Sequence, residues 1–312
     1  MTPGIINWHM LRSTLLKLSE SKGFANWVTT NGTTRRMSHR FVAGERLDEA
    51  IEAARRCNDA GMLVTLDALG ENVSTPADAQ KARDTYLGIF DRIAQEKLKA
   101  NVSCKLTQLG LDLSVEFCEG LVLSIAERAA AYDSFLRIDM EGSICTQRTV
   151  ELVKRVRAQT PCVGTVIQAY LYRSESDVQD LLGYGCRIRL CKGAYKESPE
   201  VAFPRKQDVD ANYVKLMRIL LPSGFYHAMA THDPRMIAET IRCAAEKRIS
   251  KDDFEFQMLY GVRTDLQRQL VRDGYRLRIY VPYGQEWFAY FMRRLAERPA
   301  NLGFFARNFF RP

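Results

Sequence analysis

Eight short apolar segments recur along the chain at intervals of about one strand–helix unit, and this recurrence constrains the fold more than any other feature of the sequence. Each segment is rich in Val, Ile, Leu or Phe, and short runs of this kind suit strands that are buried on both faces. The segments are LVTLDAL from Leu63, VSCKLTQL from Val102, FLRIDMEG from Phe135, GTVIQAYL from Gly164, RIRLCKGAY from Arg187, HAMATHD from His227, FEFQMLYG from Phe254 and LRIYVPYG from Leu277.

Stretches with helical periodicity separate these segments. LDEAIEAARRCNDAG precedes the first and ends with Gly61, which suits a helix C-cap. TPADAQKARDTYLGIFDRIAQEKL follows it, with Thr75 placed as the N-cap and Pro76 at the first helical position. The alternation continues through QRTVELVKRVRAQ, SESDVQDLLGYG, DPRMIAETIRCAAEKR and TDLQRQLVRDG. It predicts an α/β fold, a (βα)8 barrel. We expect one domain over 1–312, with an N-terminal helical segment over 1–62 and the barrel over 63–312.

The chain of 312 residues carries a formal net charge of +8, which raises the question of an anionic partner. However, acids interleave with the basic residues in stretches such as RRMSHR and FMRRLAER, and no long Lys/Arg run or zinc-finger spacing appears. The pattern argues against nucleic-acid binding. An anionic cofactor and substrate explain part of the excess charge more simply.

Cysteine usage and the N-terminus bear on the compartment. None of the eight cysteines forms CxxC, and several lie in apolar stretches, so we expect reduced thiols in a cytoplasmic protein. The N-terminus has no signal-peptide layout and no apolar run long enough to cross a bilayer. Its apolar residues suit one helix face, for which packing on the protein is favoured over contact with a membrane surface.

Polar side chains follow nearly every predicted strand. Because the active site of a (βα)8 barrel gathers at the C-terminal ends of its strands, these residues should share one rim. The set points to a polar ligand site and to an enzyme. In chain order its members are Asp67 with Glu71, Lys105 with Gln108, Asp139 with Glu141, Gln168, Arg189 with Lys192, Thr231 with His232 and Asp233, Gln257, and Tyr280 with Tyr283.

Two other chemistries suit parts of this rim. Asp139 and Glu141 point the same way if they share a strand and could bind a metal with His232, but the nearby cations Lys105 and Arg189 disfavour a metal site. A Schiff base on Lys105 or Lys192 is the second alternative. No G-x-G-x-x-G follows a strand and no P-loop is present.

A pair of arginines follows the last predicted strand. Tyr290, Arg293, Arg294 and Glu297 are spaced three and four apart and therefore share one flank of a helix. Adjacent guanidinium groups suit a carboxylate or phosphate between them. A solvated Arg–Glu face explains the same pattern, so the spacing alone leaves both interpretations open.

The most specific motif is Y-x-x-R-R-x-x-E, present as Tyr290 to Glu297. With LDALGEN, SCKLTQLG, RIDMEG, VIQAY, RLCKGAY, ATHD, FEFQMLYG and YVPYG, it makes the chain resemble the flavin-dependent proline dehydrogenases from roughly Leu63 to Phe305. That family includes monofunctional bacterial enzymes and the dehydrogenase domain of the bifunctional proline utilization A proteins. The resemblance implies a distorted (βα)8 barrel that holds FAD, with its last helix over the barrel mouth.

The resemblance also implies a substrate site. Lys105, Arg293 and Arg294 would hold the carboxylate of L-proline, and Asp139 would orient Lys105 as a catalytic residue. Tyr280, Tyr290 and Leu259 would form walls around the proline ring. The other positions implied are a gate residue, Glu71, that pairs with Arg293, and Glu297 of the arginine motif.

A cofactor site is implied in the same way. Arg189 aligns with an arginine that hydrogen-bonds near flavin N5, which makes it the second catalytic residue. Tyr195 stands where an aromatic residue often lies beside the adenine. The other positions that match FAD contacts are Met140, Gln168, Lys192, Gly193, Ala194, Thr231, His232 and Gln257.

The implied reaction is oxidation of L-proline to 1-pyrroline-5-carboxylate by hydride transfer from C5 to flavin N5. Electrons would pass to membrane quinone, which implies transient peripheral contact with the inner membrane face. The length leaves no room for an aldehyde dehydrogenase part, so we expect a separate protein to oxidise the product. The rival hypotheses are a hydroxyproline dehydrogenase, disfavoured because Tyr280 and Tyr290 should crowd a ring hydroxyl, a Schiff-base aldolase, and a basic scaffold without flavin.

Overall fold

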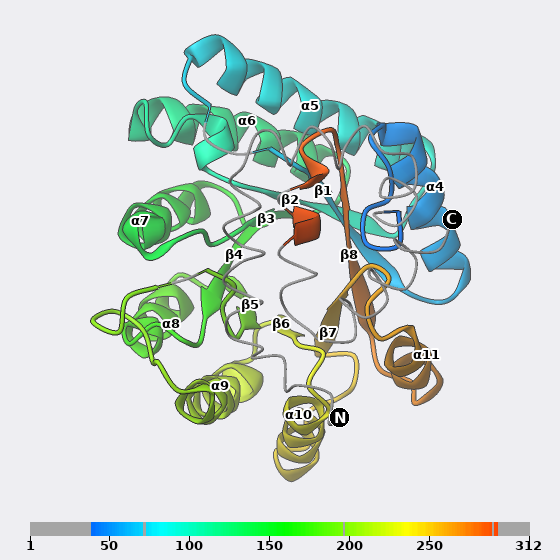
Figure 1. The fold of residues 1–312 in the computed structure, drawn as a ribbon, viewed down its shortest axis with the longest axis vertical. Helices are drawn as coiled ribbons and strands as arrows, with labels where there is room; N and C mark the ends of the chain where they lie inside the picture. The colour runs from blue at the N-terminus through cyan, green and yellow to red at the C-terminus, as the bar shows by residue number, and fades with distance from the viewer. Residues whose placement is uncertain (1–38, 71–72, 196, 289, 293–312) are drawn as a thin grey trace, which may run out of the picture.

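The computed structural model describes residues 39–70, 73–195, 197–288 and 290–292. Eight parallel strands form a closed barrel in chain order, in which β8 pairs back to β1 (Figure 1). All eight predicted segments contain a strand, so the (βα)8 prediction is confirmed. The strands are β1 Leu63–Ala68, β2 Ala100–Cys104, β3 Leu136–Ile138, β4 Val163–Gln168, β5 Arg187–Cys191, β6 His227–Ala230, β7 Phe254–Leu259 and β8 Leu277–Tyr283.

Helices surround the barrel as an outer ring (Figure 1). Thr75 caps α5 as predicted, since its hydroxyl accepts from the Asp78 N–H at 3.1 Å and Pro76 opens the helix. Two of the helices, α6 and α9, occupy stretches for which the sequence patterns named no helix. The helices are α4 Leu47–Asp59, α5 Pro76–Gln95, α6 Val115–Ala131, α7 Ser143–Gln159, α8 Ser174–Gly183, α9 Lys206–Leu220, α10 Pro234–Glu246 and α11 Thr264–Arg272.

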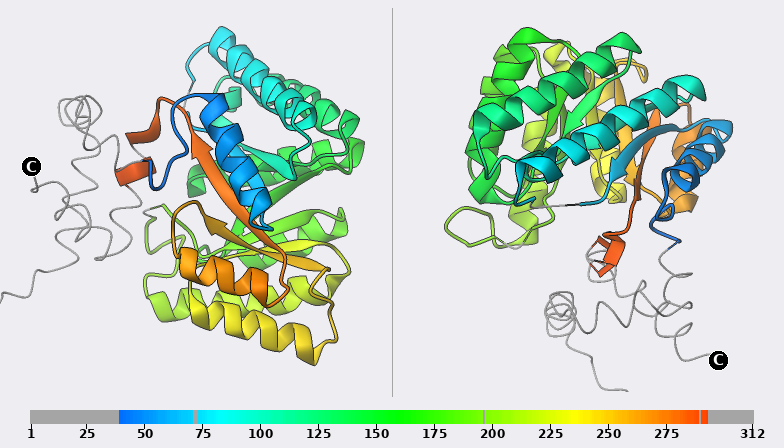
Figure 2. Two further views of the ribbon diagram at one scale, coloured as in Figure 1. Left: turned by 90° about the vertical axis from the view of Figure 1, so that its right-hand side faces the viewer. Right: turned by 90° about the horizontal axis from the view of Figure 1, so that it is seen from above.

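The wall between the last and first strands is covered by α4, which precedes β1 and packs against both β8 and β1 (Figure 2). The chain after β8 takes a different place. Trp287, Phe288 and residues 290–292 are helical, and they pack on Leu69 at the end of β1 and on Val262 beyond the end of β7. The described start of the last helix therefore lies over the barrel mouth.

Apolar and polar side chains separate onto the two faces of the strands. In β7, Phe254, Phe256 and Met258 join the large apolar core between sheet and helices, whereas Glu255 and Gln257 form hydrogen bonds inside the barrel. Successive side chains of a strand point to opposite faces, so this alternation follows from the pleat. The strands are buried on both faces, as expected, but their inner faces carry charged and polar groups.

Gly164 on β4 makes room for this polar interior. A Cβ atom there would lie 2.2 Å from the Arg187 carbonyl oxygen and 2.9 Å from Arg137 Nη1. Arg137 fills the space instead, 3% exposed, and donates to the carbonyl oxygens of Thr165 and Arg187. Its guanidinium thus satisfies backbone acceptors in the lower part of the barrel.

Some predictions fall outside the described residues: Glu71, Arg293, Arg294, Glu297 and the apolar face near the N-terminus. All eight cysteines are described and free, as expected. In the part of the chain that the structure describes, no helix combines the length and the apolar character that crossing a membrane requires.

Candidate active site

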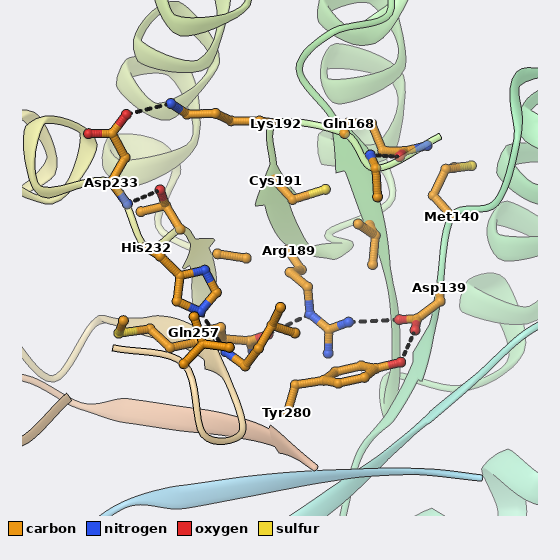
Figure 3. Close-up of a pocket in the computed structure, with 18 of the residues that line it drawn as sticks. Asp139, Met140, Gln168, Arg189, Cys191, Lys192, His232, Asp233, Gln257 and Tyr280 are labelled. Atoms are coloured by element: carbon orange, nitrogen blue, oxygen red, sulfur yellow. Dashed lines mark hydrogen bonds and ion pairs between the residues drawn. The ribbon is translucent and has the colours of Figure 1, made fainter. Parts of the chain in front are cut away.

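A cavity of about 630 Å³ opens at the C-terminal ends of the strands (Figure 3). Its size and mixed polar and apolar lining are typical of a small-molecule site. The structure brings every described member of the predicted site to this cavity: Lys105, Asp139, Met140, Gln168, Arg189, Lys192, Gly193, Ala194, Tyr195, Thr231, His232, Gln257, Leu259, Tyr280 and Tyr290.

Arg189 lies at the floor of the cavity and is 6% exposed. Its Nη1 donates to Asp139 Oδ1 at 2.7 Å and its Nε donates to Gln257 Oε1 (Figure 3). Its Nη2 donates to Ser103 Oγ at 3.1 Å. Tyr280 donates its hydroxyl to the other oxygen of Asp139 at 2.9 Å. These contacts join strands β2, β5, β7 and β8 to the loop after β3. They fix the orientation of the guanidinium group.

Tyr280 remains a neutral donor in this arrangement. Burial raises the pKa of its hydroxyl well above the usual value, and the nearby carboxylates of Asp139 and Asp67 raise it further. Arg189 stacks on the ring, with its guanidinium carbon 5.3 Å from the ring centroid. The pair presents an aromatic edge and a cation to the same side of the cavity.

Lys105 has a different partner from the one expected. Its Nζ lies 3.2 Å from Oδ2 of Asp67, whereas Asp139 pairs with Arg189, and a role of Asp139 in orienting Lys105 stays a prediction. The strand register explains the difference, because Asp67 lies opposite Ser103, two residues before Lys105 on the neighbouring strand. Burial raises the pKa of Asp67, and Lys105 offsets part of that effect.

Asp139 and Glu141 do not converge on one point. β3 ends at Ile138, so strand alternation does not govern the residues that follow it. The carboxylate of Glu141 accepts from the Thr107 backbone N–H at 3.1 Å and from the Thr107 hydroxyl at 2.6 Å, which ties the loop after β3 to the loop after β2. Both acids are therefore engaged in the protein's own hydrogen bonds.

Lys192 bridges two carboxylates at the edge of the cavity. Its Nζ lies 2.5 Å from Asp210 and 2.7 Å from Asp233, which also caps α10 by accepting from the Arg235 N–H at 3.0 Å. Burial opposes ionisation of Asp233, but Lys192 and the Arg235 N–H outweigh it and lower the pKa of this carboxyl group. The lysine is thus held as part of an ion-pair cluster.

The loop after β5 approaches the cavity with its backbone. Gly193 has φ +121°, and a Cβ atom there would lie 2.3 Å from the Tyr170 ring, so this turn requires glycine. The Ala194 N–H donates to Gln168 Oε1 at 3.3 Å, while Gln168 Nε2 donates to the Glu141 carbonyl at 2.9 Å. Both ends of the Gln168 amide are fixed.

Glu197 anchors the same loop to a helix. Its carboxylate accepts from the Ser143 N–H at 2.7 Å and from the Ser143 hydroxyl at 2.5 Å, at the first residue of α7. The Tyr170 hydroxyl also lies 3.4 Å from Glu197 Oε1. Since the N-cap residue of α7 is Gly142, which has no side chain, a residue from a distant loop supplies the cap.

The donor set fits a planar heteroaromatic ring. Val166, Met140 and Ala230 give apolar walls, and Arg189 and Gln257 give polar groups along one edge. His232 Nε2 accepts from the Leu259 N–H at 2.9 Å, so the proton of a neutral imidazole sits on Nδ1. Lys105 adds a second cation beside this slot, which suits an acidic small molecule.

Asp67 was predicted as a member of the polar rim without a specific role, and it lines the cavity. Ser103 was not predicted, and it accepts a hydrogen bond from Arg189. Asp67 was visible as a polar residue at a strand end, and its register opposite Ser103 follows only from the closed sheet. Ser103 carries no such signal, since a serine within an apolar run reads as a buried strand residue.

Comparisons with known proteins give one consistent result. The sequence profile described as proline dehydrogenase matches residues 50–307. Proline dehydrogenase 2 of Bacillus subtilis is 43% identical over 293 residues, covering 94% of this chain and 96% of that protein. Proline dehydrogenase of Deinococcus radiodurans is 41% identical over 274 residues, covering 86% and 88%.

A solved structure agrees with these sequence matches. Proline utilization A from Bdellovibrio bacteriovorus, inactivated by N-propargylglycine, superposes with a TM-score of 0.82 at 25% identity. The match covers 95% of this chain and 40% of that one, so this chain corresponds to less than half of the larger protein.

Proposed function

Because the chain belongs to the proline dehydrogenase family, we propose that it oxidises L-proline to 1-pyrroline-5-carboxylate with FAD bound in the cavity. The observation that carries the proposal is the buried Arg189, fixed on three sides beneath a slot with apolar walls. When bound, FAD supplies an oxidised ring that accepts a hydride from C5 of proline. The protein supplies position and charge.

Arg189 would favour this reaction electrostatically. A buried guanidinium at the polar edge of the slot places positive charge where the ring gains electrons, in a region that excludes most water. Gln168, Gln257 and Ala194 also line the cavity, where the second N–H of each side-chain amide would be available to the ring, and Gly193 allows close approach of the chain. Tyr195 would stack beside the adenine, and Lys192, Thr231, His232 and Met140 complete the proposed contacts.

Lys105 would hold the carboxylate of proline together with Arg293 and Arg294. Asp67 offsets part of its charge, so the arginine pair would supply the larger share of the attraction. Tyr280, Leu259 and Tyr290 line the cavity and would enclose the pyrrolidine ring. Glu71 would close the site against Arg293, with Glu297 on the same helix.

We further propose that electrons leave to a membrane quinone during transient contact with the membrane surface, and that a separate aldehyde dehydrogenase consumes the product. A Schiff-base mechanism has less support, because Lys105 and Lys192 each lie against carboxylates in the structure. These ion pairs occupy the amino groups that a Schiff base would need as nucleophiles.

The visible spectrum of the purified protein tests the proposal. We expect flavin bands that bleach on anaerobic addition of L-proline and much less with 4-hydroxyproline. D-proline serves as a control of identical composition. Flavin that L-proline does not bleach would overturn the substrate, and a protein that neither contains nor takes up FAD would overturn the cofactor.

A further inference from the structure

Glu255 lies inside the barrel one layer below the cavity, and the proposed reaction gives it no role. It is 2% exposed on β7. Its carboxylate accepts from three donors: Arg278 Nε at 2.8 Å, Tyr226 OH at 3.0 Å and Gln257 Nε2 at 2.5 Å. Arg278 in turn donates to the carbonyl of Val64 on β1 at 2.8 Å. Glu255 is therefore linked to the point where β8 and β1 close the barrel.

The carboxylate decides which way the Gln257 amide points. A carboxylate only accepts hydrogen bonds, so the NH2 group of Gln257 must face Glu255. The amide oxygen then faces up the barrel, where it accepts from Arg189 Nε. In the flipped orientation two acceptors would meet at Glu255 and two donors would meet at Arg189.

Gln257 is one of three groups that fix Arg189. The others, Asp139 and Ser103, accept from the Nη atoms, so Gln257 holds the Nε side of the guanidinium. Without that contact the guanidinium plane can rotate about its remaining hydrogen bonds. Glu255 and Gln257 are alternate residues of β7, so their side chains face the same side of the sheet and can contact each other.

We propose that Glu255 is a positioning residue for Arg189 and acts through the side-chain amide of Gln257. The inference rests on the proposed function, because it assigns Arg189 to the bound flavin. Glu255 touches neither the cavity nor a ligand there. It sets the direction of the positive charge that the flavin meets.

The surrounding charges keep Glu255 ionised for this role. Burial would raise its pKa, but the ion pair with Arg278 and the hydrogen bonds from Gln257 and Tyr226 outweigh burial and lower it. The carboxylate therefore stays an acceptor over the working pH range of most enzymes.

The test compares Glu255→Gln with Glu246→Gln. The first keeps the shape of the side chain but replaces the charged carboxylate with a neutral amide that has one acceptor oxygen and one NH2 donor, which weakens the hydrogen bond from Gln257. Glu246 lies on α10 in a surface ion pair with Arg218 and serves as the matched control. We expect Glu255→Gln to slow flavin reduction by proline about ten-fold or more, with KM for proline within about two-fold of wild type.

A second readout reports on the flavin itself. A ten-fold weaker preference for the reduced cofactor corresponds to a potential about 30 mV more negative for a two-electron couple. Gln257→Met and the double variant complete a cycle in which Glu255→Gln should have no further effect once Gln257 is gone. Unchanged potential and rate in Glu255→Gln, or additive effects in the cycle, would overturn the proposal.

Two controls separate other failures. If Glu255→Gln does not fold, Glu255→Gln combined with Arg278→Met removes both charges of the pair and carries the same comparison. A crystal structure of flavin-free Glu255→Gln should show a reoriented Gln257 amide and a displaced Arg189. Unmoved Gln257 and Arg189 would contradict the proposed action of Glu255 through Gln257. A wild-type protein without proline-reducible flavin would instead overturn the proposed function.

Discussion

Two buried cations face the cavity, and they differ in the charge that they offer a ligand. Arg189 donates through Nε and both Nη atoms, yet each Nη carries a second N–H beyond those used in these bonds. Lys105 is a compact charge paired with a fully buried carboxylate, Asp67. Arg189 therefore suits a fixed aromatic ring, and Lys105 suits one arm of a shared carboxylate site.

Arg293→Met, Arg294→Met and Lys105→Met should each raise KM for proline strongly and leave FAD bound. Removing one arm of a charged pair costs roughly 2–5 kcal/mol, which is more than ten-fold in KM. Steady-state kinetics and the flavin content of each variant measure the effect. Arg268→Met on the exposed face of α11 is the control. Unchanged KM in all three variants would exclude a carboxylate at this position.

His227 should make the fold sensitive to acid. Its Nδ1 accepts from the Ile188 N–H at 3.0 Å, and burial, reinforced by Arg137, lowers its pKa from 6.5 to about 3. Between these two pKa values His227 is protonated in the unfolded chain but neutral in the folded protein. The neutral, buried His227 therefore makes its full contribution to the free energy of unfolding above pH 6.5, and this contribution is lost as pH falls towards 3.

The loss reaches about 1.4 kcal/mol per pH unit within that window. His227→Asn keeps an acceptor near the Nδ1 position and does not titrate, so its free energy of unfolding should fall less steeply. Urea unfolding at several pH values between 7 and 4 measures both slopes. Parallel slopes would mean that other groups cause the acid sensitivity.

Residue types and strand ends, together with the family resemblance, were enough to predict which residues line the cavity. They did not predict which of these residues contact one another. Asp139 meets Arg189 across the barrel, from positions 50 residues apart, and no local pattern encodes that contact. The register of β1 on β2 decides that Asp67 meets Lys105. Glu255 was not predicted as part of the site, because its partner Arg278 lies 23 residues away on the next strand and no local pattern shows that contact.

At the scale of elements, the loop after β5 depends on a helix that it does not adjoin in sequence. Glu197 caps α7, and Phe203 further along the loop donates its N–H to the Tyr170 carbonyl at 2.8 Å. Leu171 and Ala202 form an antiparallel bridge between the same segments. These ties hold the loop that carries Gly193 and Ala194 against the cavity.

Glu197→Ala should weaken FAD binding several-fold without changing the shape of the flavin spectrum. The variant removes a cap worth about 1 kcal/mol and loosens the loop, while the groups that would surround the ring stay in place. Titration of the flavin-free protein with FAD measures the affinity. Glu200→Ala, in the same loop with an exposed side chain, is the control, and equal affinities would show that the cap does not hold the site.

The strands were predictable because each is a short apolar run between polar stretches, and that signal does not depend on tertiary contacts. The polarity of the interior was also written in the sequence. RIRLC, FEFQML and LRIY alternate apolar and polar residues, which indicates one apolar face turned to the helices. The prediction that the strands are buried on both faces was correct, but it did not use this alternation to identify the inner polar layer that contains Glu255, Arg278 and Arg137.

At the scale of the whole molecule, stability and function occupy different layers. The apolar core lies between sheet and helices, and the polar interior depends on exact space for its buried cations. Gly164 provides that space beside Arg137 and Arg187. The interior is therefore the layer least able to accept added volume.

Gly164→Ala should lower the free energy of unfolding by about 3 kcal/mol or more, because its Cβ atom collides with backbone rather than with a flexible side chain. Gly120→Ala is the matched control. Gly120 lies within α6 with open space around it, so alanine there should stabilise by roughly 0.5–1 kcal/mol. Chemical denaturation compares the two, and a neutral Gly164→Ala would mean that the strands move apart easily.

The bond from Arg278 to Val64 spans 214 residues. During synthesis on the ribosome, β1 emerges long before β8, and Glu255 has no Arg278 to meet until the last strand is free. Until then Asp139 and Ser103 can already accept hydrogen bonds from Arg189, but Glu255 lacks the ion pair with Arg278 that holds it below Gln257. Arg189 should accordingly reach its final orientation only after β8 has closed the barrel, at the end of synthesis.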